Sequence, residues 1–325
     1  MGRINVTLGL WQDRRPEEAF ETAAAADRLG FGELWIGEMA TFDAFALGAA
    51  IGLQNRQIRL ALGPFAVSVR TPVNIAMGAA TVAAAIGRPV NIALGTSSDV
   101  VVRDWHGRSR EHPARTLEES TQAVALLLQG EKVQFAGTAV RVSGYRLRLP
   151  PPESSLSVAA FGPRAVAIAA KYADRVLLNM VTPASAQRLT GEIAAAAKAA
   201  GQPTPTVALW LAASVDPGTD ALKQMVRSKI GYLAAPGYGE MFIEAGFGDL
   251  VAFARTRPHP EQLRAAMPDE QIAAAVCLAG SIDDVAKRIE EYFDAGIDEV
   301  CIAPATADDP GGLRTLTAVS TLPST

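Results

Sequence analysis

The sequence contains few cysteines, no excess of positive charge and no long hydrophobic run, and each absence excludes a class of protein. Two cysteines among 325 residues cannot form a disulfide framework, and because both lie in apolar runs we expect reduced thiols in the core. With 30 lysines and arginines against 34 aspartates and glutamates, no basic excess exists to neutralise the phosphates of a nucleic acid. The longest apolar stretch, residues 75–87, is shorter than the roughly 20 residues of a membrane-spanning helix.

The sequence also lacks the motifs of several enzyme classes. We expect a cytoplasmic protein, because the amino terminus lacks the charged segment, apolar region and cleavage site of a signal peptide. No metal site is predicted, because His106 and His112 have no carboxylate partner at helical spacing and His259 is remote. A GxSxG nucleophile elbow and a GxGxxG motif after the first strand are both absent. So few reactive side chains indicate that a bound cofactor carries the difficult chemistry.

Short apolar runs alternate with longer amphipathic segments along the chain. The runs lie at 4–11, 33–37, 58–63, 90–95, 156–160, 176–179, 207–213 and 299–302. Continuous apolar runs are typical of parallel strands that are buried on both faces. Eight of them with helices between predict an α/β fold, a (β/α)₈ TIM barrel with insertions, rather than the alternative of a doubly wound open sheet. We expect residues 1–325 to form one barrel domain, with insertions around 97–155 and 216–272.

The carboxyl ends of the strands carry the functional residues in a barrel of this kind. Glu38 follows the second run and is our first candidate for proton transfer, although a structural role is an equal alternative. A substrate cavity is expected to have apolar walls with few polar groups. The candidates for its lining, each with packing or a surface position as the alternative, are Trp11, Met39, Trp105, His106 and Trp210.

The stretch VAAFGPRAV (158–166) is the best candidate for an anion site. Gly162 allows the backbone to approach a ligand closely, and the free N–H groups of a helix that begins at Pro163 favour negative charge. Arg164 adds a formal positive charge. The alternative is an ordinary strand, turn and helix.

Six segments together resemble the luciferase-like monooxygenase superfamily, in particular its branch that depends on the deazaflavin coenzyme F420. The segments follow one another in the family's order over nearly the whole chain. They are ADRLGFGELWIGE (26–38), IRLALGPFAVSVRTPVNIA (58–76), GRPVNIALGT (87–96), RTLEESTQAVALLLQGEKVQFAG (115–137), FGPRAVAIAAKYADRV (161–176) and GSIDDVAKRIEEYFDAGIDEV (280–300).

This resemblance implies a flavin-like ring at the carboxyl-terminal mouth of the barrel. In F420-dependent relatives a non-prolyl cis peptide after the third strand backs the ring, and by position it falls on Phe65–Ala66. The implied phosphate-side cations are Arg227 and Lys229, with a solvated basic helix face as the alternative. The remaining implied cofactor contacts are Thr96, Ser97, Ala159, Ala160, Phe161 and Gly162.

The sequence departs from the family's sugar-phosphate dehydrogenases at three positions. Glu38 and Met39 stand where those enzymes carry an Asp-His pair. Ser98 and Thr182 replace their acid after strand four and their lysine after strand six. We therefore do not expect oxidation of glucose 6-phosphate.

The resemblance leaves three functions open. The first is an F420-dependent oxidoreductase that transfers a hydride between C5 of the deazaflavin and a small organic substrate. The second is an FMN-dependent monooxygenase, and the third is a flavin-binding protein without catalysis of its own. A homodimer is expected, with an enzyme that reduces F420 or flavin as a further partner.

Overall fold

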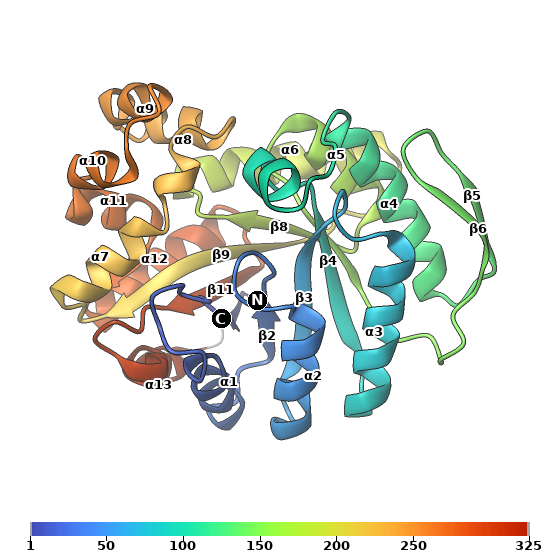
Figure 1. The fold of residues 1–325 in the computed structure, drawn as a ribbon. Coiled ribbons are helices and arrows are strands. Elements are labelled where there is room, and N and C mark those ends of the chain that lie inside the picture. Colours follow the sequence, from blue (N-terminus) through green and yellow to red (C-terminus); the bar gives the residue numbers. More distant parts are fainter. Residues whose placement is uncertain (1, 324–325) are drawn as a thin grey trace.

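The computed structural model describes residues 2–323, and its centre is a closed barrel of parallel strands (Figure 1). Strands β9 and β8 pair and close the ring, whose order is β9-β11-β1-β2-β3-β4-β7-β8. All eight predicted runs are therefore confirmed as barrel strands. Their bounds are β1 (Arg3–Thr7), β2 (Glu33–Ile36), β3 (Arg59–Ala66), β4 (Val90–Gly95), β7 (Leu156–Ala159), β8 (Arg175–Asn179), β9 (Thr206–Val215) and β11 (Glu299–Pro304).

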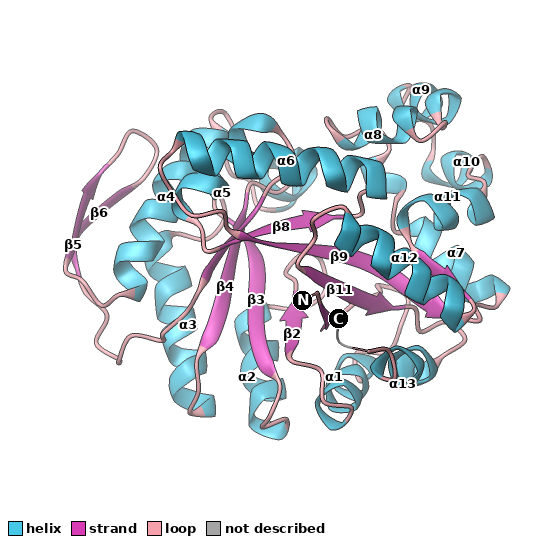
Figure 2. Cartoon of the chain, turned by 180° about the vertical axis from the view of Figure 1, so that it is seen from behind, coloured by secondary structure: helices cyan, strands magenta, loops and turns pink. Residues whose placement is uncertain are grey.

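Helices surround the barrel (Figure 2), and several of them begin at a capping residue. The side chains of Asp43, Thr71 and Thr182 each accept a hydrogen bond from the N–H of the third residue of the helix that follows. Proline fits the first turn of several of them because it has no N–H to leave unpaired. The helices are α1 (Glu18–Arg28), α2 (Ala44–Gln54), α3 (Pro72–Ile86), α4 (Pro113–Leu128), α5 (Pro163–Tyr172), α6 (Pro183–Ala199), α12 (Ile282–Asp294) and α13 (Leu313–Ser320).

Two excursions interrupt this alternation where the sequence predicts insertions. The first contains a π-helix, η1 (Val100–Trp105), before α4, and the antiparallel hairpin of β5 (Val133–Ala136) and β6 (Arg141–Tyr145) after it. The second forms a group of short helices beside the barrel (Figures 1 and 2). Its elements are α7 (Thr219–Arg227), η2 (Ile230–Tyr232), α8 (Tyr238–Glu244), α9 (Gly248–Arg255), α10 (Pro260–Ala265) and α11 (Asp269–Val276).

Two short elements near the carboxyl terminus, β10 and η3, were not predicted. The short strand β10 (Leu278–Gly280) pairs with the far end of β9, outside the ring. A single 3₁₀ turn, η3 (Pro310–Gly312), precedes α13. Ser281 and Asp284 form a capping box at the start of α12, because each side chain accepts a hydrogen bond from the backbone of the other. Among the described residues, none of the helices is both long and apolar enough to span a bilayer.

The interior of the barrel is filled mainly by small side chains and two tryptophans. Trp35 and Trp210 meet edge to face, with 5.6 Å between ring centroids. The side chains packed around them include Ala61, Ala93, Ala208, Leu177 and Cys301. The outward-facing residues of the strands pack against the helices instead and form the larger part of the core.

The amino-terminal end of the barrel is closed by charged side chains. Arg175 lies at the start of β8, and its guanidinium is 2.6 Å from Glu33 and 3.4 Å from Glu299. The same guanidinium lies over the Trp35 ring, 5.1 Å from its centroid. Asn91 donates to the second oxygen of Glu33 at 2.5 Å. Burial raises the pKa of Glu299, although the positive charge of Arg175 acts to lower it.

Candidate active site

The carboxyl-terminal end of the barrel has a floor of very small residues. A Cβ atom on Gly95, at the end of β4, would lie 3.2 Å from Cβ of Pro64 and 3.5 Å from Cβ of Ala159. Gly37, after β2, lies beside Trp210 instead, because a Cβ atom there would be 3.5 Å from the indole ring, an ordinary van der Waals contact. The part of the floor formed by Gly95, Pro64 and Ala159 has no long side chains and is suited to a flat ring.

The end of β3 corrects the predicted position of the cis peptide and limits which atoms of Phe65 and Ala66 could contact a ring. The cis peptide is Gly63–Pro64, a prolyl bond, so the expectation of a cis bond at Phe65–Ala66 is wrong. The register with β4 shifts between Leu62 and Phe65, which places an irregular segment of backbone at the mouth. The side chain of Phe65 is buried and stacks on Phe45 of α2, with 4.4 Å between ring centroids. Only the backbone of Phe65 and Ala66 could therefore lie against the face of a cofactor ring.

Glu38 lies in a charged network rather than in an apolar wall. Arg70, which follows β3, donates from Nε to one oxygen at 2.7 Å and from Nη2 to the other at 2.6 Å. The backbone N–H of Ala44 donates to the same carboxylate at 3.1 Å. Arg70 also pairs with Asp43, and its hydrogen bond to Glu38 is the first cause of its raised pKa. These hydrogen bonds fix the orientation of the Glu38 side chain.

The segment after β4 turns sharply at Ser97, whose φ of 55° is in the left-handed region. Arg110 holds this turn by donating to the Ser97 carbonyl at 3.1 and 2.8 Å. Thr96, just before it, is partly buried at the mouth. Trp105 and His106, at the end of η1, are exposed, so any part in a substrate cavity would be at its outer rim.

The predicted anion site is an open helix terminus. Gly162 is the residue before α5, has extended backbone angles and offers no side-chain cap. A Cβ atom there would meet nothing within 4 Å. Arg164 is exposed in the first turn of the helix. The free N–H groups of this turn therefore have no side-chain cap, and the turn carries a positive charge, an arrangement that favours a phosphate or carboxylate.

An aromatic group covers one side of the mouth. Phe161, after β7, packs on Tyr238 of α8 with 4.3 Å between ring centroids. Tyr238 in turn meets Tyr232 of η2 edge to face at 5.0 Å. Burial raises the pKa of both tyrosines. Ala159 and Ala160 lead from β7 into this group.

The predicted tryptophans lie at different depths. Trp210 is on β9 inside the barrel, and its indole nitrogen is buried without a hydrogen-bond partner in the described part of the chain. Trp11 donates from its indole nitrogen to the Pro304 carbonyl at 2.9 Å, which ties the segment after β1 to the end of β11. Met39 is 54% exposed and stands outside the packed wall.

The two cations proposed for a phosphate differ in their surroundings. Arg227 is half exposed and forms an ion pair with Asp13 at 2.6 Å. Lys229 is 6% exposed, so the alternative of a solvated basic face is wrong for this residue. Burial lowers the pKa of Lys229, whose titratable neighbour is the buried thiol of Cys277. The cofactor role of both residues stays a prediction.

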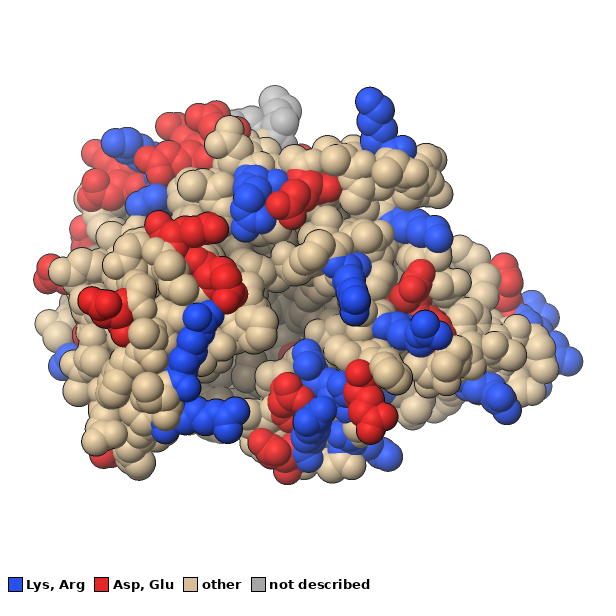
Figure 3. All heavy atoms as spheres, turned by 90° about the horizontal axis from the view of Figure 1, so that it is seen from above, with Lys and Arg blue, Asp and Glu red and all other residues tan. Residues whose placement is uncertain are grey.

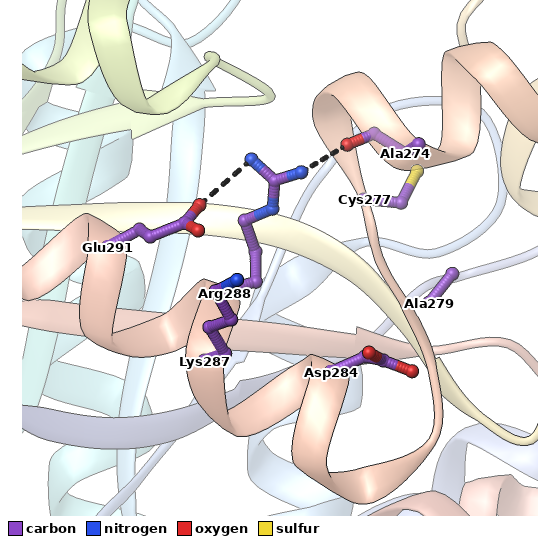
Figure 4. Close-up of a pocket in the computed structure, with 7 residues that line it drawn as sticks. All are labelled: Ala274, Cys277, Ala279, Asp284, Lys287, Arg288 and Glu291. Atoms are coloured by element: carbon purple, nitrogen blue, oxygen red, sulfur yellow. Dashed lines mark hydrogen bonds and ion pairs between the residues drawn. The ribbon is translucent and has the colours of Figure 1, made fainter.

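Cys277 also borders a surface pocket of about 260 Å³ outside the barrel (Figure 4). Arg288 of α12 is already engaged there, because it donates to the Ala274 carbonyl at 2.7 Å and pairs with Glu291 at 3.1 Å. This pocket is separate from the barrel mouth.

Figure 3 shows, from above, a hollow near the centre of the molecule with charged side chains of both signs around it.

Sequence reasoning did not identify Arg70, Tyr232 and Tyr238 as site residues. Arg70 had a recognisable signal, because it stands just after the third predicted strand and before a helix that begins at Pro72. The tyrosines had none, since the insertion that carries them has no repeated pattern and its position over β7 and β8 depends on tertiary packing.

Comparison with known proteins assigns the chain to a family. The family model described as luciferase-like monooxygenase matches residues 4–299, and the chain belongs to this family. Among named relatives it is similar to two 5,10-methylenetetrahydromethanopterin reductases. The protein of Methanolobus tindarius is 27% identical over 204 residues, covering 61% of this chain and 62% of that protein. The protein of Archaeoglobus fulgidus is 25% identical over 215 residues, covering 63% and 64%. The chain thus spans less than two thirds of the length of either relative.

Solved structures show the same fold over nearly the whole chain. An F420-dependent secondary alcohol dehydrogenase in complex with an F420–acetone adduct has a TM-score of 0.81 at 18% identity, with 99% of both chains covered. The coenzyme F420 dependent tetrahydromethanopterin reductase of Methanopyrus kandleri has a TM-score of 0.82 at 19% identity, with 98% of both covered. The oxygenating constituent of 3,6-diketocamphane monooxygenase from Pseudomonas putida, in complex with FMN, has a TM-score of 0.72 at 17% identity, covering 99% of this chain and 97% of that one. At these identities the likeness establishes the fold alone.

Proposed function

We propose that the chain is an F420-dependent oxidoreductase that transfers a hydride between C5 of the deazaflavin and a small organic substrate. The observation that carries the proposal is the open amino terminus of α5 with Arg164, at the edge of a floor of small residues. A flat ring with an anionic tail fits this pair of features. The F420-dependent proteins of the same fold, and the named activities of the relatives, support the same cofactor.

The chain's own residues would bind and orient this cofactor. The backbone of Phe65, Ala66, Thr96 and Ser97 would border the ring, and the N–H groups after Gly162 would hold its anionic part. When bound, the deazaflavin supplies the carbon that gives or takes the hydride. Ala159, Ala160 and Phe161 would border it on the side of β7, with Arg227 and Lys229 as the more distant phosphate-side candidates.

Glu38 is the group that we propose for proton handling. Its two oxygens accept from Arg70 and Ala44, which fixes where the carboxylate points. We expect Glu38→Gln to reduce substrate-dependent turnover and to change its pH profile, because the amide can neither take nor release a proton. Unchanged turnover and an unchanged profile would remove Glu38 from the mechanism.

Titration of the purified protein with F420 and, separately, with FMN tests the choice of cofactor. Fluorescence quenching should show micromolar or tighter F420 binding and weaker FMN binding. Arg164→Ala should weaken F420 binding about tenfold through loss of a charge-assisted contact. Arg188→Ala, which removes an exposed arginine of α6, is the control and should leave the affinity unchanged. Equal F420 affinity in both variants would contradict the anion site.

FMN-dependent oxygenation is the alternative, favoured by the FMN complex of the diketocamphane monooxygenase constituent. It requires preference for FMN in the titration and oxygen uptake with reduced FMN, together with a reductase as partner. The homodimer, the reducing partner and the cytoplasmic location stay predictions.

A further inference from the structure

Glu38 lies in a part of the chain that does not fix its side chain locally. Residues 37–43, between β2 and α2, form neither a helix nor a strand. Two of the three hydrogen bonds that the Glu38 carboxylate accepts within the described residues come from the Arg70 guanidinium, and the third comes from the N–H of Ala44. The direction of this carboxylate therefore depends mainly on a residue of the next βα unit.

Arg70 is itself held from several sides. Its backbone N–H donates to the carbonyl of Ala66 at 2.9 Å. Its guanidinium pairs with Asp43 as well as with Glu38. The same group lies 5.2 Å from the ring centroid of Phe45 and 5.4 Å from that of Phe65. An arginine with this many contacts has lost most of its rotamer freedom, so it is a rigid support for a partner.

These contacts connect two parts of the proposed site. The backbone of Arg70 is bonded to Ala66, which we expect to border the cofactor ring, and its side chain is bonded to Glu38. The two parallel N–H bonds of a guanidinium fix the direction of a carboxylate as well as its distance. Direction matters here, because a shift of about 1 Å in a reacting group can cost about a hundredfold in rate.

We propose that Arg70 is a positioning residue that sets the direction of the Glu38 carboxylate relative to the cofactor ring. The inference rests on the proposed function and adds the group through which the segment after β3 controls the proton-handling residue. Lysine cannot replace Arg70 in this role, because a single ammonium group does not form two parallel bonds to a carboxylate. Since Arg70 acts through Glu38, its replacement should have no effect at the ring once Glu38 is replaced.

Hydrogen exchange at Ala44, measured by NMR on the free protein, reports where Glu38 is held. Ala44 is the first residue of α2, so its N–H has no partner within the helix and is protected by Glu38. Arg70→Lys should make Ala44 exchange about threefold to tenfold faster, the worth of one hydrogen bond. Ala46, whose N–H is capped by Asp43 in the same turn, should change less.

Arg14→Lys is the matched control, because Arg14 also binds a carboxylate with its guanidinium and lies away from Glu38. Its Nε donates to the two oxygens of Glu18 at 3.0 and 3.1 Å. Its side chain is 27% exposed, against 22% for Arg70. The control should leave the exchange of Ala44 unchanged. Arg70→Met, which removes every donor, should accelerate Ala44 at least as much as Arg70→Lys, and circular dichroism confirms that each variant is folded.

The absorption spectrum of bound F420, followed with pH, tests the link to the cofactor. Charge near the ring tunes the electronics of a cofactor, so Glu38→Gln should alter the pH dependence of the bound spectrum. Arg70→Lys should alter it in the same direction and should add nothing when combined with Glu38→Gln. A purely structural role of Arg70 predicts instead that the two changes add.

Three results would overturn the inference: unchanged exchange of Ala44 in Arg70→Lys, equal acceleration of Ala44 and Ala46, or additive changes in the spectrum. Equal acceleration would mean that Arg70 only braces the start of α2. Failure of the wild-type protein to bind F420 would defeat the proposed function, whereas unchanged exchange of Ala44 with F420 binding intact would defeat only this inference.

Discussion

The two ends of the barrel use polar groups in opposite ways. At the amino-terminal end, Arg175, Glu33 and Glu299 neutralise one another within the ring of strands, and Asn91 takes up a remaining carboxylate oxygen. At the carboxyl-terminal end, Glu38, Arg70 and Asp43 form a second network, but the first turn of α5 has no side-chain cap and Arg164 beside it is exposed. Polar groups that hydrogen-bond to each other stabilise the fold, whereas unpaired polar groups at the carboxyl ends of the strands are available to bind a ligand.

Arg175→Met should have the largest effect on stability. Removal of the guanidinium leaves two buried carboxylates without their shared partner, which costs about 3–5 kcal/mol in the free energy of unfolding. Urea denaturation measures the loss. Arg188→Met breaks an exposed pair with Glu192 and should cost under about 1 kcal/mol. Similar losses in the two variants would mean that the closed end is not a stabilising network.

Gly237→Ala should have an intermediate effect, located at the open end. The new methyl group would meet the Phe161 ring, and alanine is strained at this positive φ, so we expect a local cost of about 1–3 kcal/mol. Hydrogen exchange across residues 229–247 should become faster. Gly246→Ala is the matched control, because its φ is 93° but a Cβ atom would meet nothing within 4 Å. Equal exchange in the two variants would show that contact with Phe161 does not hold α8.

Glu299 and Asp43 should give the smallest effects, of opposite sign with pH. Burial raises the pKa of Glu299. Burial also opposes the shift of Asp43, but the Ala46 N–H and Arg70 still hold the pKa of Asp43 below its ordinary value. The contribution of Glu299 to stability is therefore full below about pH 4.3 and declines as the pH rises through its folded-state pKa. That of Asp43 is present above about pH 3.9 and is lost as the pH falls through its folded-state pKa.

Urea denaturation from about pH 3 to pH 8 checks both signs. The wild-type advantage over Glu299→Gln should shrink as the pH rises, and the advantage over Asp43→Asn should shrink as the pH falls toward 3. The two variants serve as controls for each other, because global acid effects act on both. A common sign would contradict the difference between the two ends.

The barrel was predictable because its strands are buried on both faces and read as continuous apolar runs. The open terminus of α5 was predictable too, since Gly162 and Pro163 form a local signal. The surroundings of Glu38 were not, because they depend on Arg70, a residue from the next βα unit. Lys229 was read as a possible surface cation, but tertiary packing buries it. Local chemistry is visible in the sequence, whereas contacts between distant segments need the fold.

Strand β9 continues past the point where the ring needs it, and β10 pairs with this extension at Ala213, Ser214 and Val215. The helical segment from α7 to α11 therefore leaves from and returns to a two-stranded anchor that lies outside the closed ring. Such a segment can be exchanged for another without changing the strands of the ring. Replacing it with a segment of different length and composition should leave the hydrogen-bonded ring and its register unchanged.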